Sequence, residues 1–243
     1  PASWTFGEVV EPSESQRNFA GGLDGCLDFI LLEGLRNAFA FEKWDAPRLA
    51  DFITRHEAFF PPAFSRPSFL DNHDMNRFLW AAGNNKRRLR LAAMCQFTLS
   101  GPPIIYYGTE VGLSQERDVR QGMHGLPEES RLPMLWDSAQ DHKLLAYYRK
   151  LIELRKQHPP LRQPGLQVLR AQGTLLAYQR GDLLVCLNLA NHLDMMSLPE
   201  LTKDAELLLE ANSPVSLDKD DDGKLQLNLP ALGGAVFKTK PKT

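Results

Sequence analysis

Acidic side chains follow three short apolar runs of this sequence, where they could carry out acid–base chemistry. Glu8 lies near the end of the first run, Asp71-Asn72-His73-Asp74 follows a second, and Thr109-Glu110 follows a third. A carboxylate beside a buried strand is unfavourable unless a polar group faces it or its proton is used. Each acid taken singly is explained as well by a helix cap or a turn. Three acids at three strand ends together favour a functional site.

The runs that carry these acids alternate with helical stretches. Apolar segments at residues 4–10, 25–32, 68–70 and 104–107 predict four strands. Helices are predicted to begin after Asp45, to cover residues 89–99 and to begin at Asp141. Such alternation is typical of parallel strands with helices packed outside, and a (β/α)8 barrel builds its active site at the carboxyl ends of such strands.

The sequence changes character near residue 160. Short apolar runs at 175–178, 183–189 and 207–209 are separated by turn residues such as Gly173 and Gly181-Asp182. Closely spaced strands of this kind predict a small antiparallel β-sandwich. We therefore expect an α/β domain at residues 1–160 and an all-β domain at residues 161–243.

Composition argues against several classes of function. The 243 residues are 43% hydrophobic and carry a net charge of -2, which gives no electrostatic case for nucleic acid or an anionic membrane. No apolar stretch is long enough to span a bilayer. The absence of a signal peptide favours the cytoplasm, although an opening on an apolar strand suggests that the natural N-terminus is missing. Cys26, Cys95 and Cys186 lie far apart in apolar runs and are expected to be buried thiols.

Several segments resemble the α-amylase superfamily, glycoside hydrolase family 13. Residues 69–77 (FLDNHDMNR) look like its "NHD" segment, and residues 101–112 (GPPIIYYGTEVG) resemble its last barrel strand and following loop. Residues 6–9 (FGEV) resemble the fifth strand, residues 131–137 (RLPMLWD) a familiar loop, and residues 147–190 the last helix with the start of the C-terminal β-domain. The resemblance implies the second half of a TIM barrel, units five to eight, followed by that β-domain.

The resemblance also implies roles for single residues. Glu8 would donate a proton to the glycosidic oxygen and then activate water, and Asp74 would be the second carboxylate at the cleavage subsite. His73, Arg77 and Tyr107 would contact the substrate, with Arg77 the weaker candidate and Tyr107 explained as well by core packing. Retaining glycosidases need one carboxylic acid and one carboxylate on opposite sides of the bond. Thr109 stands where the family often has Asp, which puts any role of that position in doubt.

The attacking carboxylate of the family has no counterpart in this sequence. The family carries it in a Gly-x-Arg-x-Asp motif on the fourth strand, and no such motif occurs in the 243 residues. About 160 residues precede the β-domain, whereas a whole barrel takes about 250. We expect part of a retaining α-glucan hydrolase or transglycosylase of the α-amylase, cyclomaltodextrinase or neopullulanase type. The isolated chain is expected to be inactive and to self-associate through exposed half-barrel edges.

A different class of function stays open. The chain could be a non-catalytic relative, kept as a binding or partner-stabilising module, but the presence of both Glu8 and Asp74 favours the enzyme. Its expected partner is an α-glucan or maltooligosaccharide, with neither nucleic acid nor membrane.

No metal or cofactor is expected from these residues, and calcium would belong only to an intact enzyme. The run Asp218-Lys219-Asp220-Asp221-Asp222-Gly223 matches the opening of an EF-hand calcium loop. The twelfth position of that loop is Leu229 instead of Glu, and no flanking helices are expected. The run therefore predicts a solvated hairpin turn.

Overall fold

Four extended segments in the first part of the chain run parallel to one another. The computed structural model describes residues 3–219 and 225–239. Strands β1 (Phe6–Gly7) and β2 (Gly25–Cys26) pair in parallel, and parallel bridges continue from Gly25 to Ser65 and from Ser68 to Pro103. Any side chain at Gly25 would overlap the carbonyl group of Ser65, so glycine is required for this close approach. The four segments therefore lie in chain order, as the alternation of strands and helices predicts.

The strands are shorter than predicted. The strand predicted at 25–32 is wrong beyond Cys26, because Asp28 accepts a hydrogen bond of 2.9 Å from the Leu31 N–H and starts helix α2 (Phe29–Leu35). The strands predicted at 68–70 and 104–107 are reduced to the single bridge from Ser68 to Pro103. Prolines 67, 102 and 103 have no N–H group, so a longer ladder cannot form around this bridge.

The predicted helices are confirmed, and side-chain caps define their starts. Asp45 accepts a 3.0 Å hydrogen bond from Arg48 N at the start of α3, and Asp141 accepts one of 2.9 Å from Leu144 N at the start of α6. Helix α5 starts three residues earlier than predicted because Asn85 caps it. The helices and helical turns are α1 (Ser13–Arg17), α2, η1 (Arg36–Ala40), α3 (Ala46–Phe59), α4 (Phe78–Ala81), α5 (Lys86–Thr98), η2 (Thr109–Val111), η3 (Pro127–Arg131), η4 (Asp137–Ala139), α6 (His142–Gln157) and η5 (Pro159–Arg162).

The remaining strands form two antiparallel sheets. The first has the order β3-β4-β5-β10-β7 and the second the order β6-β9-β8. Their bounds are β3 (Leu166–Gln172), β4 (Leu175–Arg180), β5 (Leu183–Asn188), β6 (Asp194–Met196), β7 (Glu206–Ala211), β8 (Ser216–Lys219), β9 (Leu225–Leu229) and β10 (Gly234–Lys238). Buried side chains such as Cys186, Leu227 and Phe237 pack in a core shared by both sheets. The prediction of antiparallel strands in this part of the chain is confirmed, whereas the domain boundary near residue 160 stays a prediction.

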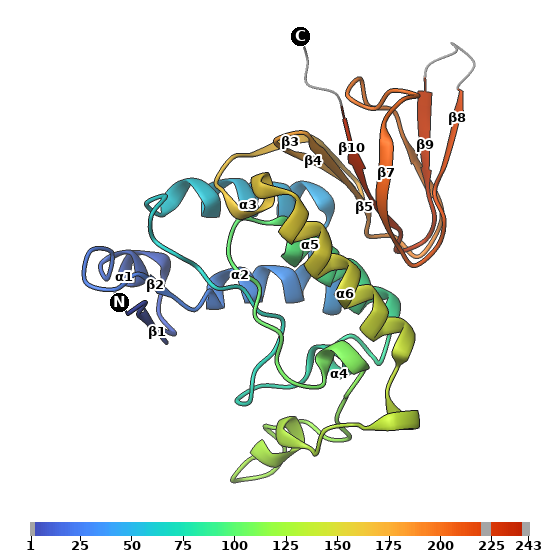
Figure 1. Cartoon of the computed structure of the whole chain (residues 1–243). Helices are drawn as coiled ribbons and strands as arrows, with labels where there is room; N and C mark the ends of the chain where they lie inside the picture. The colour runs from blue at the N-terminus through green and yellow to red at the C-terminus, as the bar shows by residue number, and fades with distance from the viewer. Residues whose placement is uncertain (1–2, 220–224, 240–243) are drawn as a thin grey trace.

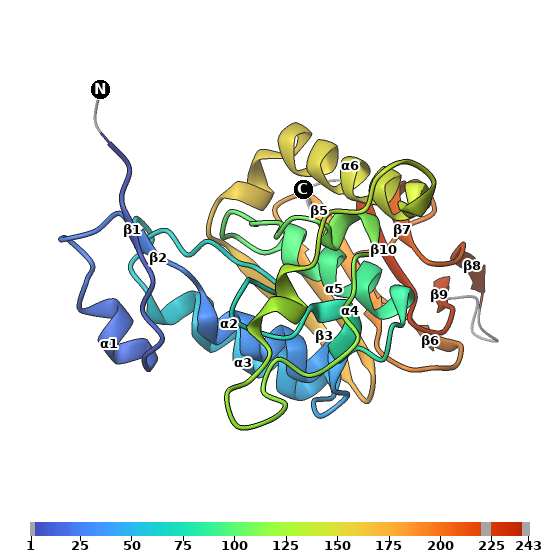
Figure 2. The ribbon, with the colours of Figure 1, turned by 90° about the horizontal axis from the view of Figure 1, so that it is seen from below.

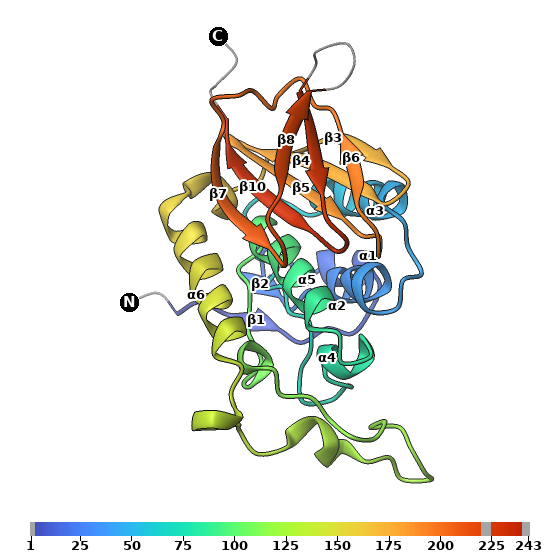
Figure 3. The same cartoon turned by 90° about the vertical axis from the view of Figure 1, so that its right-hand side faces the viewer.

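The larger sheet also packs against the helices. Leu89 of α5, Leu151 of α6 and Val185 of β5 belong to one hydrophobic cluster. The larger sheet consequently lies over one side of the helical layer, while β1, β2 and α1 lie at the other side of the molecule (Figures 1 and 3).

Three further expectations can be compared with the structure. Cys26, Cys95 and Cys186 are all buried and free, as predicted. Strands β8 and β9 flank the EF-hand-like run, but its residues from 220 to 223 lie outside the described part of the chain. Within residues 3–219 and 225–239, no helix is both long enough and apolar enough to cross a membrane. A cytoplasmic location stays a prediction.

Candidate active site

The acidic candidates follow the carboxyl ends of the parallel segments. Glu8 follows β1, Asp74 follows the segment around Ser68, and Glu110 follows the segment around Pro103. Because the segments are parallel, these ends face the same direction. Figure 2 shows β1 and β2 beside the helical layer.

Asp74 is the best-defined carboxylate at this end. Its Oδ1 atom accepts a 3.0 Å hydrogen bond from Arg131 Nη2, and its Oδ2 atom lies 3.3 Å from His73 Nε2. The Asp74 and His73 side chains are about half exposed, at 55% and 52%. The carboxylate is thus held between two basic groups and remains accessible to a ligand from solvent.

The turn η3 fixes this pair to its neighbours. Ser130 Oγ and Arg131 Nε both donate to the His73 carbonyl oxygen, at 2.7 and 3.1 Å. Arg131 therefore contacts both the backbone of His73 and the carboxylate of Asp74. Sequence reasoning assigned no role to Arg131, although the likeness of residues 131–137 to a family loop was the signal that could have found it.

Glu8 is separate from this cluster. Its side chain is exposed, and it forms no hydrogen bond or ion pair with any residue that the structure describes. The exposed rings of Trp4 and Phe6 lie beside each other on the same arm, with centroids 5.0 Å apart. The structure brings His73 and Asp74 together but does not join Glu8 to them, because β1 is the outermost of the four parallel segments.

Arg77 is fully buried and holds the framework beneath the cluster. Its Nε and Nη1 atoms donate to the carbonyl oxygens of Ser130 and Tyr107, at 3.0 and 2.5 Å. Its guanidinium also lies 4.2 Å from the ring centroid of Tyr106. These contacts make Arg77 a structural link between three segments, so the geometry does not support the predicted contact with substrate.

Tyr107 presents its ring partly to solvent. The side chain is 39% exposed, while its hydroxyl group donates a 2.8 Å hydrogen bond to the Leu132 carbonyl oxygen. Burial, with the neighbouring Tyr107, raises the pKa of Tyr106 to about 12, which keeps that phenol neutral. The Tyr107 ring is available for apolar contact with a ligand, and its hydroxyl group is already paired.

A second aspartate of the NHD segment has a different function. Asp71 is buried and accepts hydrogen bonds of 2.8 Å from Phe78 N and from Thr109 Oγ1. Burial raises the pKa of Asp71, although these hydrogen bonds and the charges of Arg77 and Arg36 oppose the change. Thr109 therefore fastens the fourth segment to the third. Asp71 supports the loop that carries Asp74 instead of facing a ligand.

Comparisons with known proteins identify the family. A family model described as alpha amylase, catalytic domain, matches residues 3–142. Alpha-amylase 2 of Dictyoglomus thermophilum is 43% identical over 162 residues, covering 66% of this chain and 29% of that protein. A cyclomaltodextrinase of a Bacillus species is 31% identical over 187 residues, and the match covers 75% of this chain and 32% of that cyclomaltodextrinase. The chain thus spans about a third of the length of these curated relatives.

A solved structure extends the likeness to nearly the whole chain. The crystal structure of an Anoxybacillus α-amylase superimposes with a TM-score of 0.77 at 26% identity, covering 99% of this chain and 53% of that one. The family match, the relatives and the shared fold agree with the NHD segment and with the strand-end acids. The chain belongs to the α-amylase family of glycoside hydrolases, glycoside hydrolase family 13.

Proposed function

We propose that this chain supplies the acid/base and the second carboxylate of a retaining α-glucan hydrolase or transglycosylase. The observation that carries the proposal is the Asp74 carboxylate, held open to solvent by Arg131 and His73 at the end of a parallel segment in a chain of this family. The relatives named α-amylase, neopullulanase and cyclomaltodextrinase suggest α-glucans and maltooligosaccharides as substrates.

The proposed architecture is the second half of a (β/α)8 barrel, residues 1–160, followed by a C-terminal β-domain, residues 161–243. The order of the four parallel segments and the antiparallel sheets after Leu166 support it. In this arrangement Glu8 protonates the leaving oxygen and then activates water. Asp74 and His73 bind hydroxyl groups of the sugar at the cleavage point, where the negative charge of Asp74 favours an oxocarbenium-like state.

The reaction also needs an attacking carboxylate on the opposite face of the sugar. The family's Gly-x-Arg-x-Asp motif is missing from the 243 residues, so we propose that the isolated chain does not form a glycosyl intermediate. The separation of Glu8 from Asp74 agrees with a site that is incomplete within this chain. No group of three acids, histidines or cysteines among the described residues could hold a metal ion, and the proposal assigns none.

The test compares the chain alone with a completed barrel. The purified chain is incubated with maltooligosaccharides, pullulan and a chromogenic α-glucoside, first alone and then fused to the barrel residues that precede the matched region in the Dictyoglomus relative. We expect turnover only in the fusion, and its loss by about a thousandfold or more in Glu8→Gln or Asp74→Asn. Glu11→Gln, an exposed acid on the same arm, is the matched control.

Two outcomes would contradict the proposal. Turnover by the chain alone that disappears in Glu8→Gln would show that the site is complete without an added segment. A fusion that binds maltooligosaccharides without cleaving them would favour the non-catalytic binding module.

A further inference from the structure

Trp136 carries the most exposed aromatic ring among residues 3–219 and 225–239. The residue is 68% exposed, and its indole forms no ring–ring or cation–π contact with any residue in these ranges. The ring of Trp44, by contrast, lies 5.1 Å from the ring of Phe52 and 4.9 Å from the guanidinium of Arg48. Single exposed apolar residues are common on protein surfaces, so the position and the support of Trp136 decide whether its ring has a function.

Two anchors hold the stretch with Trp136 at the same end of the molecule as Asp74. Before Trp136, the Leu132 carbonyl oxygen accepts a 2.8 Å hydrogen bond from the Tyr107 hydroxyl group. After it, Asp141 N donates a 3.0 Å hydrogen bond to the Val111 carbonyl oxygen. Tyr107 and Val111 both lie at the carboxyl end of the fourth parallel segment, where the acidic candidates are found. Trp136 also follows Arg131 by five residues, so their Cα atoms are at most about 17 Å apart.

The backbone on both sides of the indole is fixed by hydrogen bonds. Gln140 Nε2 donates to the Leu135 carbonyl oxygen at 2.7 Å, and Ala139 N donates to the Trp136 carbonyl oxygen at 3.1 Å. The next residue, Asp137, has a φ of 50°, a left-handed conformation that residues other than glycine rarely adopt. Such backbone strain concentrates at functional sites. The turn thus presents the Trp136 ring to solvent from a defined support.

The order of the parallel segments sets the side of the site on which Trp136 lies. Glu8 follows β1 at one flank, Asp74 follows the third segment, and Trp136 is held at the end of the fourth. In the proposed function, Glu8 protonates the oxygen of the leaving part of the glucan, so that part extends toward β1. The part that stays bound at Asp74 therefore extends toward Trp136. This step rests on the proposed function.

The faces of an indole ring suit a glucose unit. A glucose ring exposes C–H groups on its two faces and hydroxyl groups around its edge, and the positive ends of C–H bonds are attracted to the negative face of an aromatic ring. We propose that Trp136 stacks on the glucose unit next to the one held by His73 and Asp74, on the side of the glucan that is not released. The residue then determines specificity, because it favours substrates with at least two glucose units on that side.

The test is a titration of the whole chain with maltose, and with glucose as the partial ligand, followed by nuclear magnetic resonance. The imidazole signals of His73 report the first sugar in every variant, and the indole N–H signal of Trp136 reports the second. We expect maltose to shift both signals and to bind about tenfold more tightly than glucose, which should shift mainly the signals of His73. Trp136→Ala should bring the two affinities close together, and Trp136→Phe should keep most of the difference because it keeps an aromatic face.

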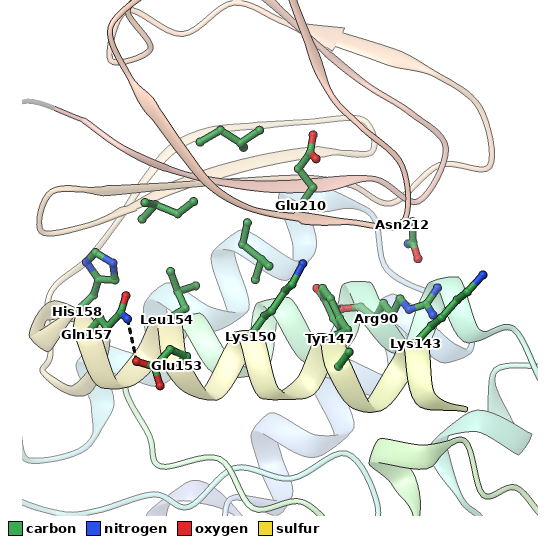
Figure 4. Close-up of a pocket in the computed structure, with 14 residues that line it drawn as sticks. Arg90, Lys143, Tyr147, Lys150, Glu153, Leu154, Gln157, His158, Glu210 and Asn212 are labelled. Carbon is green, nitrogen blue, oxygen red and sulfur yellow. Dashed lines mark hydrogen bonds between the residues drawn. The ribbon is translucent and has the colours of Figure 1, made fainter. Parts of the chain in front are cut away.

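The matched control is Leu207→Ala, which should leave both affinities unchanged. It removes an exposed apolar side chain from the groove between α6 and β7 (Figure 4), which no residue of the candidate active site lines. Equal affinities of maltose and glucose, or an unshifted Trp136 signal with maltose, would overturn the proposal. An equal loss of both affinities in Trp136→Ala would overturn it too, because it would indicate a structural role. The measurement needs no turnover, so an inactive completed barrel would contradict the proposed function without deciding this result.

Discussion

Arg155 should be one of the most sensitive positions in the chain. It lies near the end of α6, is 8% exposed, and donates four hydrogen bonds of 2.7 to 2.9 Å. The acceptors are the carbonyl oxygens of Phe97, Leu99, Ser100 and Gly101, where α5 ends and the segment toward Tyr107 begins. This one guanidinium therefore fixes the start of the segment that supports the candidate active site.

The magnitude follows from two opposing effects. Four hydrogen bonds from a charged donor are each worth about 1.5 to 3 kcal/mol, so together they contribute roughly 6 to 12 kcal/mol. Burial lowers the pKa of Arg155 to about 10. This lowering reflects the cost of keeping the charged guanidinium inside the protein, which opposes the gain from the hydrogen bonds. The half-buried carbonyl groups of Ser100 and Gly101 can also be rehydrated when the side chain is removed. We therefore expect Arg155→Met to lower the free energy of unfolding by about 3 to 5 kcal/mol.

Urea unfolding followed by circular dichroism measures this loss. Arg149→Met removes an exposed arginine from the same helix and should change the free energy of unfolding by less than about 0.5 kcal/mol. Arg155→Lys should recover only part of the stability, because one ammonium group cannot reach four carbonyl oxygens. A loss below about 1 kcal/mol in Arg155→Met, equal to that in the control, would refute this reasoning.

Three further predictions concern the candidate site and the arm that carries Glu8. The Arg131–Asp74 ion pair is half exposed, so a double-mutant cycle with Arg131→Met and Asp74→Asn should give a coupling free energy of about 0.2 to 1 kcal/mol. A coupling above about 2 kcal/mol would contradict the expectation that an exposed ion pair is weak. Because burial raises the pKa of Asp71, the folded state holds that proton more tightly than the unfolded chain. Its contribution to stability is therefore complete below the ordinary pKa of about 3.9 and is lost as pH rises through the raised value. Asp71→Asn should consequently be more stable relative to the native sequence at pH 7 than at pH 4 in urea titrations, and a constant difference would argue against the raised pKa. The exposed rings of Trp4 and Phe6 lie next to an edge of β1 that no strand among the described residues covers. Sedimentation velocity should therefore show self-association that increases with concentration and that the double variant Trp4→Ser/Phe6→Ser reduces. A monomer at every concentration would contradict it.

Local signals in the sequence determined most of the helices and the candidate acids. Asp45 and Asp141 define helix starts because a cap needs only a side-chain oxygen within three residues of the N–H groups it accepts. The NHD segment and the acids after the other strands could also be found from the sequence, because each lies within a few residues of a predicted strand end. The turn residues between short apolar runs likewise predicted the antiparallel strands after Leu166.

The tertiary structure decided the contacts between distant residues. An apolar run such as 25–32 suits a strand or a helix equally well, and only the cap made by Asp28 selects the helix. Arg131 holds Asp74 from 57 residues away, and Arg77 is enclosed between Ser130 and the tyrosine pair. No local pattern encodes which cation pairs with a carboxylate or which is buried, because both depend on how separate segments pack. The sequence therefore determined which residue types stand at the strand ends, and the packing decided which of them stay accessible to solvent and which support the loops.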